Sequence, residues 1–164
     1  MDSWLWLVRH QEGRIYLEFT HSLATPTGRA MTLTLFISGN PAPQGSKRYV
    51  GRGIMVEACK RVKPWRDDIR NALTDASGRP LSHFPGAVVV TLDFVMPRPK
   101  STPKRTPHAV KKPDLDKLIR AVFDAVTSSG VWIDDSQVVA VTAKKRIAES
   151  NEATGVCLMV KDAA

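Results

Sequence analysis

Two pairs of aspartates are the residues whose type and spacing could do chemistry. Asp114 and Asp116 flank Leu115 at the expected start of a helix, and Asp134 and Asp135 are adjacent in a polar turn. Carboxylates held this close repel one another unless a cation lies between them. Mg²⁺ takes oxygen ligands together with waters and substrate phosphate, and it can polarise a phosphodiester. The four carboxylates therefore predict a metal site for Mg²⁺, with Mn²⁺ as an alternative ion.

Each pair also has a structural interpretation. Aspartate is favoured at a helix N-terminus because it caps the first turn and complements the helix dipole, and Asp134-Asp135 could be an ordinary turn. We expect the pairs to meet, because the chain runs along the helix and returns after Asp135. Arg120 lies one turn after Asp116, where it could neutralise charge on a phosphate. It could equally form an i, i+4 ion pair with Asp116 or Asp124.

The positive charge of the chain surrounds these acids. The 164 residues carry a net charge of +8, which suggests a polyanionic partner such as nucleic acid. Residues 1–30 contain three basic and three acidic side chains, whereas residues 98–120 contain eight basic and two acidic ones, a net of +6. A solvated face is the alternative interpretation of such a run. The basic residues that we expect to bind DNA phosphates are Lys47, Arg48, Arg52, Lys104, Arg105, Lys111, Lys112, Lys117, Lys144 and Lys145.

The elements that must position these residues follow from hydrophobic periodicity. Alternating apolar residues predict strands over 31–38 and 87–96, and two more strands over 138–146 and 155–161. Helical spacing predicts helices over 64–75 and from after Pro113 to Gly130, and the proline-rich stretches 39–53 and 97–112 are expected to be loops. The predicted fold is α/β (α+β), a mixed four-stranded sheet packed against two helices.

The charge difference also suggests the domain organisation. We expect residues 31–164 to be the functional domain and residues 1–30 to be an appendage, which is either not native or native but dispensable. Weak strand alternation over 4–9 and 14–19 could form a hairpin within it. In the first case Met31 is the natural start, and in either case a chain beginning at Met31 that failed to fold would refute the hypothesis.

Composition excludes several other classes of protein. The two cysteines, Cys59 and Cys157, form no CxxC pair, so a cysteine-based zinc module and a disulfide scaffold are both excluded. We expect both thiols to be reduced in a cytoplasm. No apolar run reaches the roughly 18 residues of a membrane span, so no membrane partner is expected.

A longer motif contains all four aspartates. Asp114-Leu-Asp-Lys-Leu-Ile-Arg-Ala-Val-Phe-Asp-Ala-Val, followed by Gly130-Val-Trp-Ile-Asp-Asp-Ser-Gln-Val138, resembles the signature of the RusA-type Holliday junction resolvases. That pattern is D-L-D-N-L-x-K-A-x-x-D-A-L and then G-x-W-x-D-D-x-Q-V, and the spacing matches without gaps. Lys117 replaces the asparagine of the pattern and Arg120 replaces its lysine. Arginine keeps the positive charge but is a poorer proton donor.

The resemblance implies a dimeric, Mg²⁺-dependent endonuclease of recombination and repair, often carried by phages, that cuts four-way DNA junctions symmetrically. It implies essential roles for Asp114, Asp116 and Asp135, and a lesser one for Asp134. Two cuts require two active sites and hence a two-fold homodimer. The alternative is a non-catalytic protein that binds branched DNA, with the aspartates acting as caps. A general nuclease would prefer linear duplex, and a nucleotide-sugar transferase with a DxD motif would need a larger domain.

Overall fold

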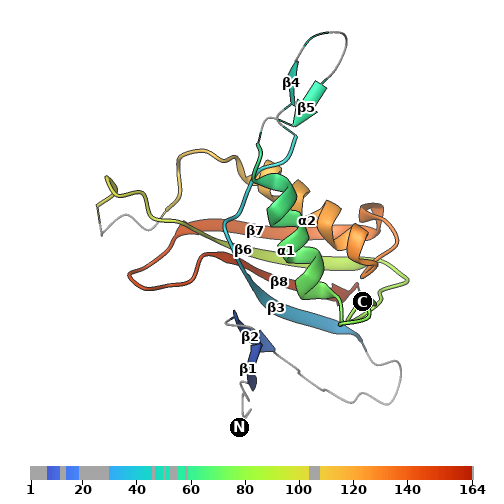
Figure 1. Cartoon of the computed structure of the whole chain (residues 1–164). Coiled ribbons are helices and arrows are strands. Elements are labelled where there is room, and N and C mark those ends of the chain that lie inside the picture. Colours follow the sequence, from blue (N-terminus) through green and yellow to red (C-terminus); the bar gives the residue numbers. More distant parts are fainter. Residues whose placement is uncertain are drawn as a thin grey trace.

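The computed structural model describes residues 7–11, 14–18, 30–45, 47–49, 51, 55–57, 59–103 and 108–163. Two α-helices lie on one face of a mixed sheet (Figure 1). The helices are α1 (Val62–Leu73) and α2 (Leu115–Ser129), with a short 3-10 helix η1 (Asp135–Gln137). The strands are β1 (Leu7–Gln11), β2 (Arg14–Glu18), β3 (Thr32–Ser38), β4 (Lys47–Tyr49), β5 (Met55–Glu57), β6 (Val88–Met96), β7 (Val138–Ile147) and β8 (Gly155–Asp162).

The order of the main sheet is β1-β2-β3-β8-β6-β7. Its central strands β3, β8 and β6 are antiparallel neighbours, whereas β7 lies parallel to β6 because α2 forms the crossover between them. The predicted α+β class, with four strands and two helices, is confirmed. The hairpin β1–β2 adds two strands through the pair Glu18↔Leu35. β4 and β5 form a separate ribbon, and β4 lies within the stretch 39–53 that was expected to be a loop.

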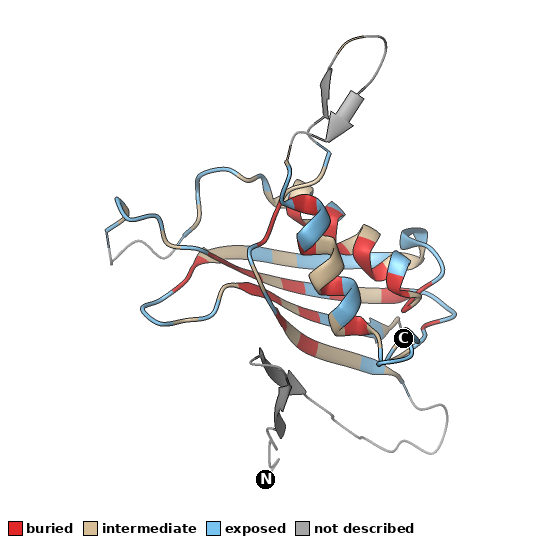
Figure 2. Ribbon diagram, in the orientation of Figure 1, coloured by how far each residue is buried: buried red, intermediate tan, exposed pale blue. Residues whose placement is uncertain are grey.

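The hydrophobic core lies between the helices and the sheet (Figure 2). Val88, Val90, Leu92 and Phe94 alternate along β6 and are fully buried, so the inward face of this central strand is wholly apolar. Trp65 on α1 and Trp132 after α2 are only 1% exposed, so both are core anchors. Burying side chains of this size is the main stabilising contribution to such a domain.

Both helices follow their sequence signals. Leu118, Val122 and Val126 form the buried stripe of α2, and Gly130 ends the helix in the left-handed conformation, with φ of 79°. Helix α1 begins at Val62, two residues earlier than predicted, and Pro64 falls in its first turn, where its missing N–H costs no hydrogen bond.

Cys59 and Cys157 are both free cysteines, and neither forms a disulfide. Among the described residues, no helix is both long and apolar enough to cross a membrane.

Candidate active site at the start of α2

Asp114 occupies the N-cap position of α2. Its backbone is extended, with φ of −70° and ψ of 144°, as predicted for a residue preceding the first helical turn. The side chain makes no capping hydrogen bond. Its Oδ2 lies 3.4 Å from Nζ of Lys117, and 48% of the side chain is exposed. The Asp114 carboxylate therefore faces a cationic group and solvent rather than closing the helix.

Asp116 lies in the first turn of α2 and is exposed. The first turn of a helix presents unpaired N–H groups and the positive end of the helix dipole, and both favour negative charge. This end of α2 therefore carries two carboxylates that solvent can reach, with Asp114 just before the helix and Asp116 just inside it.

Cationic side chains surround a cavity of about 260 Å³ beside Asp114. The residues lining it are Pro43, Arg61, Lys112, Pro113, Asp114 and Lys117. Three cations around one carboxylate can attract a phosphate to the edge of the acidic pair. Lys145 supports this arrangement from β7, because its Nζ donates to the carbonyl of Lys111 at 3.0 Å and to that of Pro113 at 2.6 Å.

Arg120 lies on the flank of α2 that the loop of residues 41–45 approaches. The Gln44 N–H donates to the Lys117 carbonyl at 3.0 Å, and a Cβ built on Gly45 would lie 2.9 Å from Nη1 of Arg120. Asp124 is engaged elsewhere, since Gln44 Nε2 donates to it and Arg66 Nη1 lies 3.5 Å from it. Among the described residues, no ion pair joins Arg120 to Asp116 or Asp124, so the salt-bridge alternative has no support here.

Asp134 has a structural role. Its carboxylate accepts from the Ser136 N–H at 2.9 Å and forms a reciprocal capping box with Gln137 at the start of η1. The hydrogen bonds from Ser136 hold the pKa of the Asp134 carboxyl below its usual value. Gln137 also connects this turn to the segment before β6, because its Nε2 donates hydrogen bonds to the backbone carbonyls of Phe84 and Gly86.

Asp135 lies at the other end of α2 from Asp114 and Asp116. The helix has 15 residues, which at about 1.5 Å per residue corresponds to about 22 Å. Trp132 Nε1 donates to Thr127 Oγ1 at 2.7 Å, so the segment leading to Asp135 is held at the C-terminal end of the helix. The expected convergence of the two aspartate pairs does not occur within one chain. No group of three or more acidic, cysteine or histidine side chains able to hold a metal is found in the described part.

The basic residues predicted to bind DNA have several different environments. Lys111 and Lys112 are exposed beside the cavity, and Lys117 lines it while contacting Asp114. Lys144 and Lys145 make contacts within the fold, Lys144 with Asp93 at 3.2 Å. Lys47 and Arg48 belong to β4, and Arg52, Lys104 and Arg105 lie outside the described residues. Whether any of them contacts DNA stays a prediction.

Sequence patterns did not single out the residues that approach α2 from other elements. Arg61 is absent from the basic residues predicted to bind DNA, and Gln44 and Gly45 fall in a stretch predicted only as a loop. No sequence pattern marks the approach of this loop; the structure shows that Gly45, with a φ of +95° that favours glycine, lets the loop come close to Arg120.

The donor groups at the start of α2 fit a hard divalent cation. Asp114 and Asp116 offer carboxylate oxygens that solvent can reach, and Mg²⁺ sites in proteins commonly use one or two carboxylates plus substrate phosphates. The neighbouring cationic cavity is placed to receive such a phosphate.

Comparison with known proteins identifies the family. A model described as "Endodeoxyribonuclease RusA" matches residues 38–159. A stretch of 29 residues is 55% identical to crossover junction endodeoxyribonuclease RusA of Escherichia coli strain K12, of Escherichia coli O6:H1 strain CFT073 and of Shigella sonnei strain Ss046. This stretch spans 18% of the chain and only 24% of each relative. Because the family model matches most of its length, the chain belongs to the RusA endodeoxyribonuclease family.

Proposed function

We propose that this protein is a Mg²⁺-dependent endonuclease that resolves four-way DNA junctions by paired phosphodiester hydrolysis. The observation that carries the proposal is the pair of exposed carboxylates, Asp114 and Asp116, at the start of α2 beside a cationic cavity. The family to which the chain belongs and the name of its relatives support the same activity. A cytoplasmic role in recombination and repair, in a phage or prophage setting, is part of the proposal.

At the start of α2, the acidic residues would bind the cation and the basic residues would bind phosphate. Asp114 and Asp116 would hold the cation, which when bound polarises the phosphodiester and activates water. Arg61, Lys112 and Lys117 would bind phosphate in the cavity that they line. Arg120 would stabilise charge that develops at phosphorus, because a guanidinium can contact two phosphate oxygens at once.

The third proposed carboxylate requires a second copy of the chain. Cutting two opposed strands needs two active sites, which a two-fold homodimer provides. Asp135 lies about a helix length from Asp114 and Asp116 in its own chain. We therefore propose that each site combines Asp114 and Asp116 of one subunit with Asp135 of the partner subunit.

Residues 31–164 are proposed as the functional unit and residues 1–30 as an appendage. The core formed by the described side chains extends from Leu35 to Val160. Met31 is itself tied to the last strand, since its N–H donates to Asp162 Oδ2 at 2.7 Å.

Substitution of Asp116 by Asn tests the catalytic proposal. We expect Asp116→Asn to lower the rate of junction cleavage in Mg²⁺ by at least about 100-fold, because it removes a charged ligand of the cation. Binding to the same junction should persist, because the cationic surface is unchanged. Cleavage is measured with strand-specific labels on a mobile four-way junction, and binding by gel shift without metal.

A matched control is Asp67→Asn, which removes the same charge from α1 on another part of the surface. Its cleavage rate should equal that of the wild type. Undiminished cleavage by Asp116→Asn would contradict the catalytic assignment. Wild-type protein that bound junctions in Mg²⁺ without cutting them would favour the non-catalytic DNA-binding alternative, and preferred cleavage of linear duplex would indicate a general nuclease.

A further inference from the structure

A mainly apolar pocket of about 230 Å³ lies where β6 and β7 end. Met96 and Ile147, which pair with one another at the ends of these strands, line the pocket and are only 7% and 8% exposed. The other apolar residues that line it are Pro41, Pro97, Pro99, Ala109, Val110 and Pro113. A concave, mostly apolar surface with a few polar groups is the usual form of a binding site for a small organic group.

Part of the wall of this pocket is formed by the segment of residues 97–112, which is attached to the rest of the fold near both of its ends. Close to its start, Nε of Arg98 donates to the carbonyl of Ala148 at 3.0 Å. Close to its end, His108 forms a backbone bridge with Arg146 on β7. The described part of this wall is therefore held in place without a ligand, and a preformed site loses little conformational entropy on binding.

The pocket adjoins the cationic cavity beside Asp114. Arg61, Lys112 and Pro113 line both spaces, and Lys111 adds a further cation to the pocket. A ligand that occupied both spaces would need negative charge on one side and a group with apolar faces on the other. A nucleotide has this composition, because its phosphate is joined through a sugar to a base whose faces can stack on apolar side chains.

Three polar side chains also line the pocket, namely those of Asn40, Thr102 and His108. Amide, hydroxyl and imidazole groups can donate hydrogen bonds to the polar edge of a base and accept them from it. A base inside a duplex reaches such a pocket only if it leaves the stack, which costs least where base pairing is already disturbed. The branch point of a four-way junction is a place of this kind.

We propose that this pocket binds one unstacked nucleobase of the DNA strand whose phosphate lies in the adjoining cavity. The inference rests on the proposed function, because it takes the substrate to be a four-way junction. A base held in the pocket would determine which phosphate reaches Asp114 and Asp116. Ala109 and Val110 would thus act by positioning the strand, without contact to the reacting phosphate.

Fluorescent bases test the pocket without cleavage. We place 2-aminopurine or pyrrolocytosine, which replace a purine and a pyrimidine and are quenched while stacked, singly at the nucleotides that flank the branch point. When wild-type protein binds without metal, the fluorescence at one position should rise at least about threefold, because an extruded base loses its stacking partners. Ala109→Leu fills part of the pocket, so it should remove most of this rise while the gel shift persists. Ala76→Leu, the same change at an exposed residue of the turn after α1, should behave as the wild type.

A second measurement introduces a mismatch at the position that responds. The mismatch lowers the cost of extruding the base, so the wild type should bind this junction at least about threefold more tightly than the fully paired one. Val110→Ser should lose most of this gain, because it removes an apolar side chain from the pocket. Val110 is 84% exposed, so the substitution leaves the core intact and the test does not depend on the folding of Ala109→Leu. Leu81→Ser, at an exposed leucine outside the pocket, should keep the full gain.

Two results would overturn the proposal. One is a bound junction in which neither analogue brightens at any position. The other is a fluorescence rise and a mismatch gain that are the same in Ala109→Leu, Val110→Ser and the wild type. If the wild type still cut junctions in either case, the pocket alone would be wrong. A rise that depends on the pocket, in a wild type that cuts no junction in Mg²⁺, would refute the proposed activity alone.

Discussion

Asp134 and Asp135 are adjacent and chemically identical, yet the fold uses them differently. The Asp134 carboxylate is occupied by the Ser136 N–H and by the capping box of η1. Asp135 is the first residue of η1, and its side chain is exposed. An acid already used as a cap is poorly placed to bind a cation, whereas its neighbour points to solvent. This local difference is our reason to assign the metal-binding role to Asp135.

The two aspartates should therefore respond differently to the same substitution. Asp134→Asn keeps the oxygen that accepts from Ser136, so we expect junction cleavage within about threefold of the wild type and an unchanged melting temperature. Asp135→Asn should lower cleavage at least about 100-fold with no loss of stability, because it removes a metal ligand and no internal contact. Cleavage rates and thermal unfolding of the two variants provide the comparison. A severe loss in Asp134→Asn with normal activity in Asp135→Asn would reverse the assignment.

At the level of elements, the loop of residues 41–45 lies against the flank of α2 that carries Arg120. Gly45 has φ of +95° and lies so close to Arg120 that a methyl group would contact Nη1 at 2.9 Å. We expect Gly45→Ala to cost about 1–3 kcal/mol of stability through backbone strain. It should also lower junction cleavage at least about tenfold, because it displaces the guanidinium that we assign to phosphate.

Gly51 offers a matched control for this prediction. Its φ is +96°, but a Cβ there would meet nothing within 4 Å. Gly51→Ala should therefore show a similar loss of stability in thermal unfolding, with cleavage unchanged at a temperature where both variants are folded. Equal activity of the two variants would mean that the contact between Gly45 and Arg120 has no role in catalysis.

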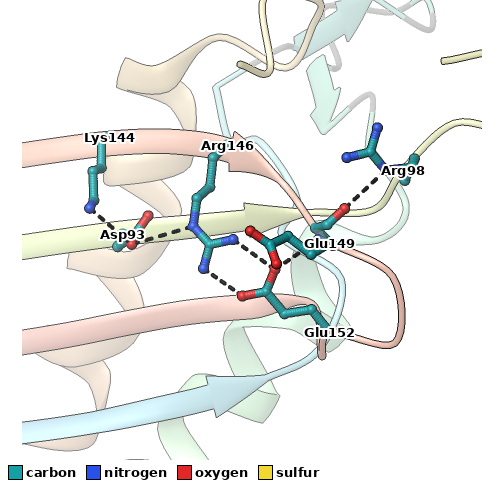
Figure 3. A network of polar contacts seen from close by, with 7 residues as sticks. Asp93, Arg98, Lys144, Arg146, Glu149 and Glu152 are labelled. Carbon is teal, nitrogen blue, oxygen red and sulfur yellow. Dashed lines mark hydrogen bonds and ion pairs between the residues drawn. The ribbon is translucent and has the colours of Figure 1, made fainter. Parts of the chain in front are cut away.

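A second element-level feature is the ion network that joins the end of β7 to β6 and to the turn that leads from β7 to β8 (Figure 3). Arg146 donates two hydrogen bonds to Glu152, at 2.7 and 2.6 Å, and its Nε lies 3.7 Å from Asp93. The Glu149 N–H donates to the same Glu152 carboxylate at 2.8 Å. The bonds from Arg146 lower the pKa of Glu152 to about 2, and the Glu149 N–H adds to this effect. In its charged form Glu152 therefore holds the turn between β7 and β8 against Arg146 on β7.

The lowered pKa of Glu152 predicts a pH dependence of stability. A carboxyl whose pKa is depressed by folding contributes stability that is complete above its ordinary pKa of 4.5 and is lost as pH falls towards 2. The loss is at most about 3 kcal/mol. Glu152→Gln should lower stability at pH 7 and flatten this part of the profile in urea unfolding. Glu149→Gln, whose contact is made by its backbone, should keep the wild-type profile; equal slopes in wild type and Glu152→Gln would contradict the prediction.

The sequence predicted those features of the elements that depend on local patterns. The apolar stripe of α2, its end at Gly130 and the extended backbone of Asp114 all follow from periodicity and capping preferences. The contact of Gly45 with Arg120 could not be predicted, because it joins residues 75 positions apart and no local pattern records it. The position of Asp135 could have been inferred, since a helix of 15 residues separates its ends by about 22 Å.

For the whole molecule, the main consequence is that one chain does not hold a complete set of the proposed ligands. Asp114 and Asp116 lie at the start of α2, and Asp135 lies beyond its end. A site shared between subunits would make cleavage depend on dimerisation, so that a lone subunit could not cut single strands. Such a dependence of cleavage on dimerisation suits an enzyme that must make two cuts in one junction.

Complementation between two inactive variants tests this account most directly. We co-express Asp116→Asn and Asp135→Asn chains with different tags, purify heterodimers through both tags, and measure strand-resolved cleavage of a four-way junction in Mg²⁺. If sites are shared, each heterodimer has one intact site and one that carries both substitutions. It should nick single strands at about half the wild-type rate of first cuts, without paired cuts, while each homodimer stays inactive. Heterodimers as inactive as both homodimers would show that each site lies within one chain, and would contradict the account.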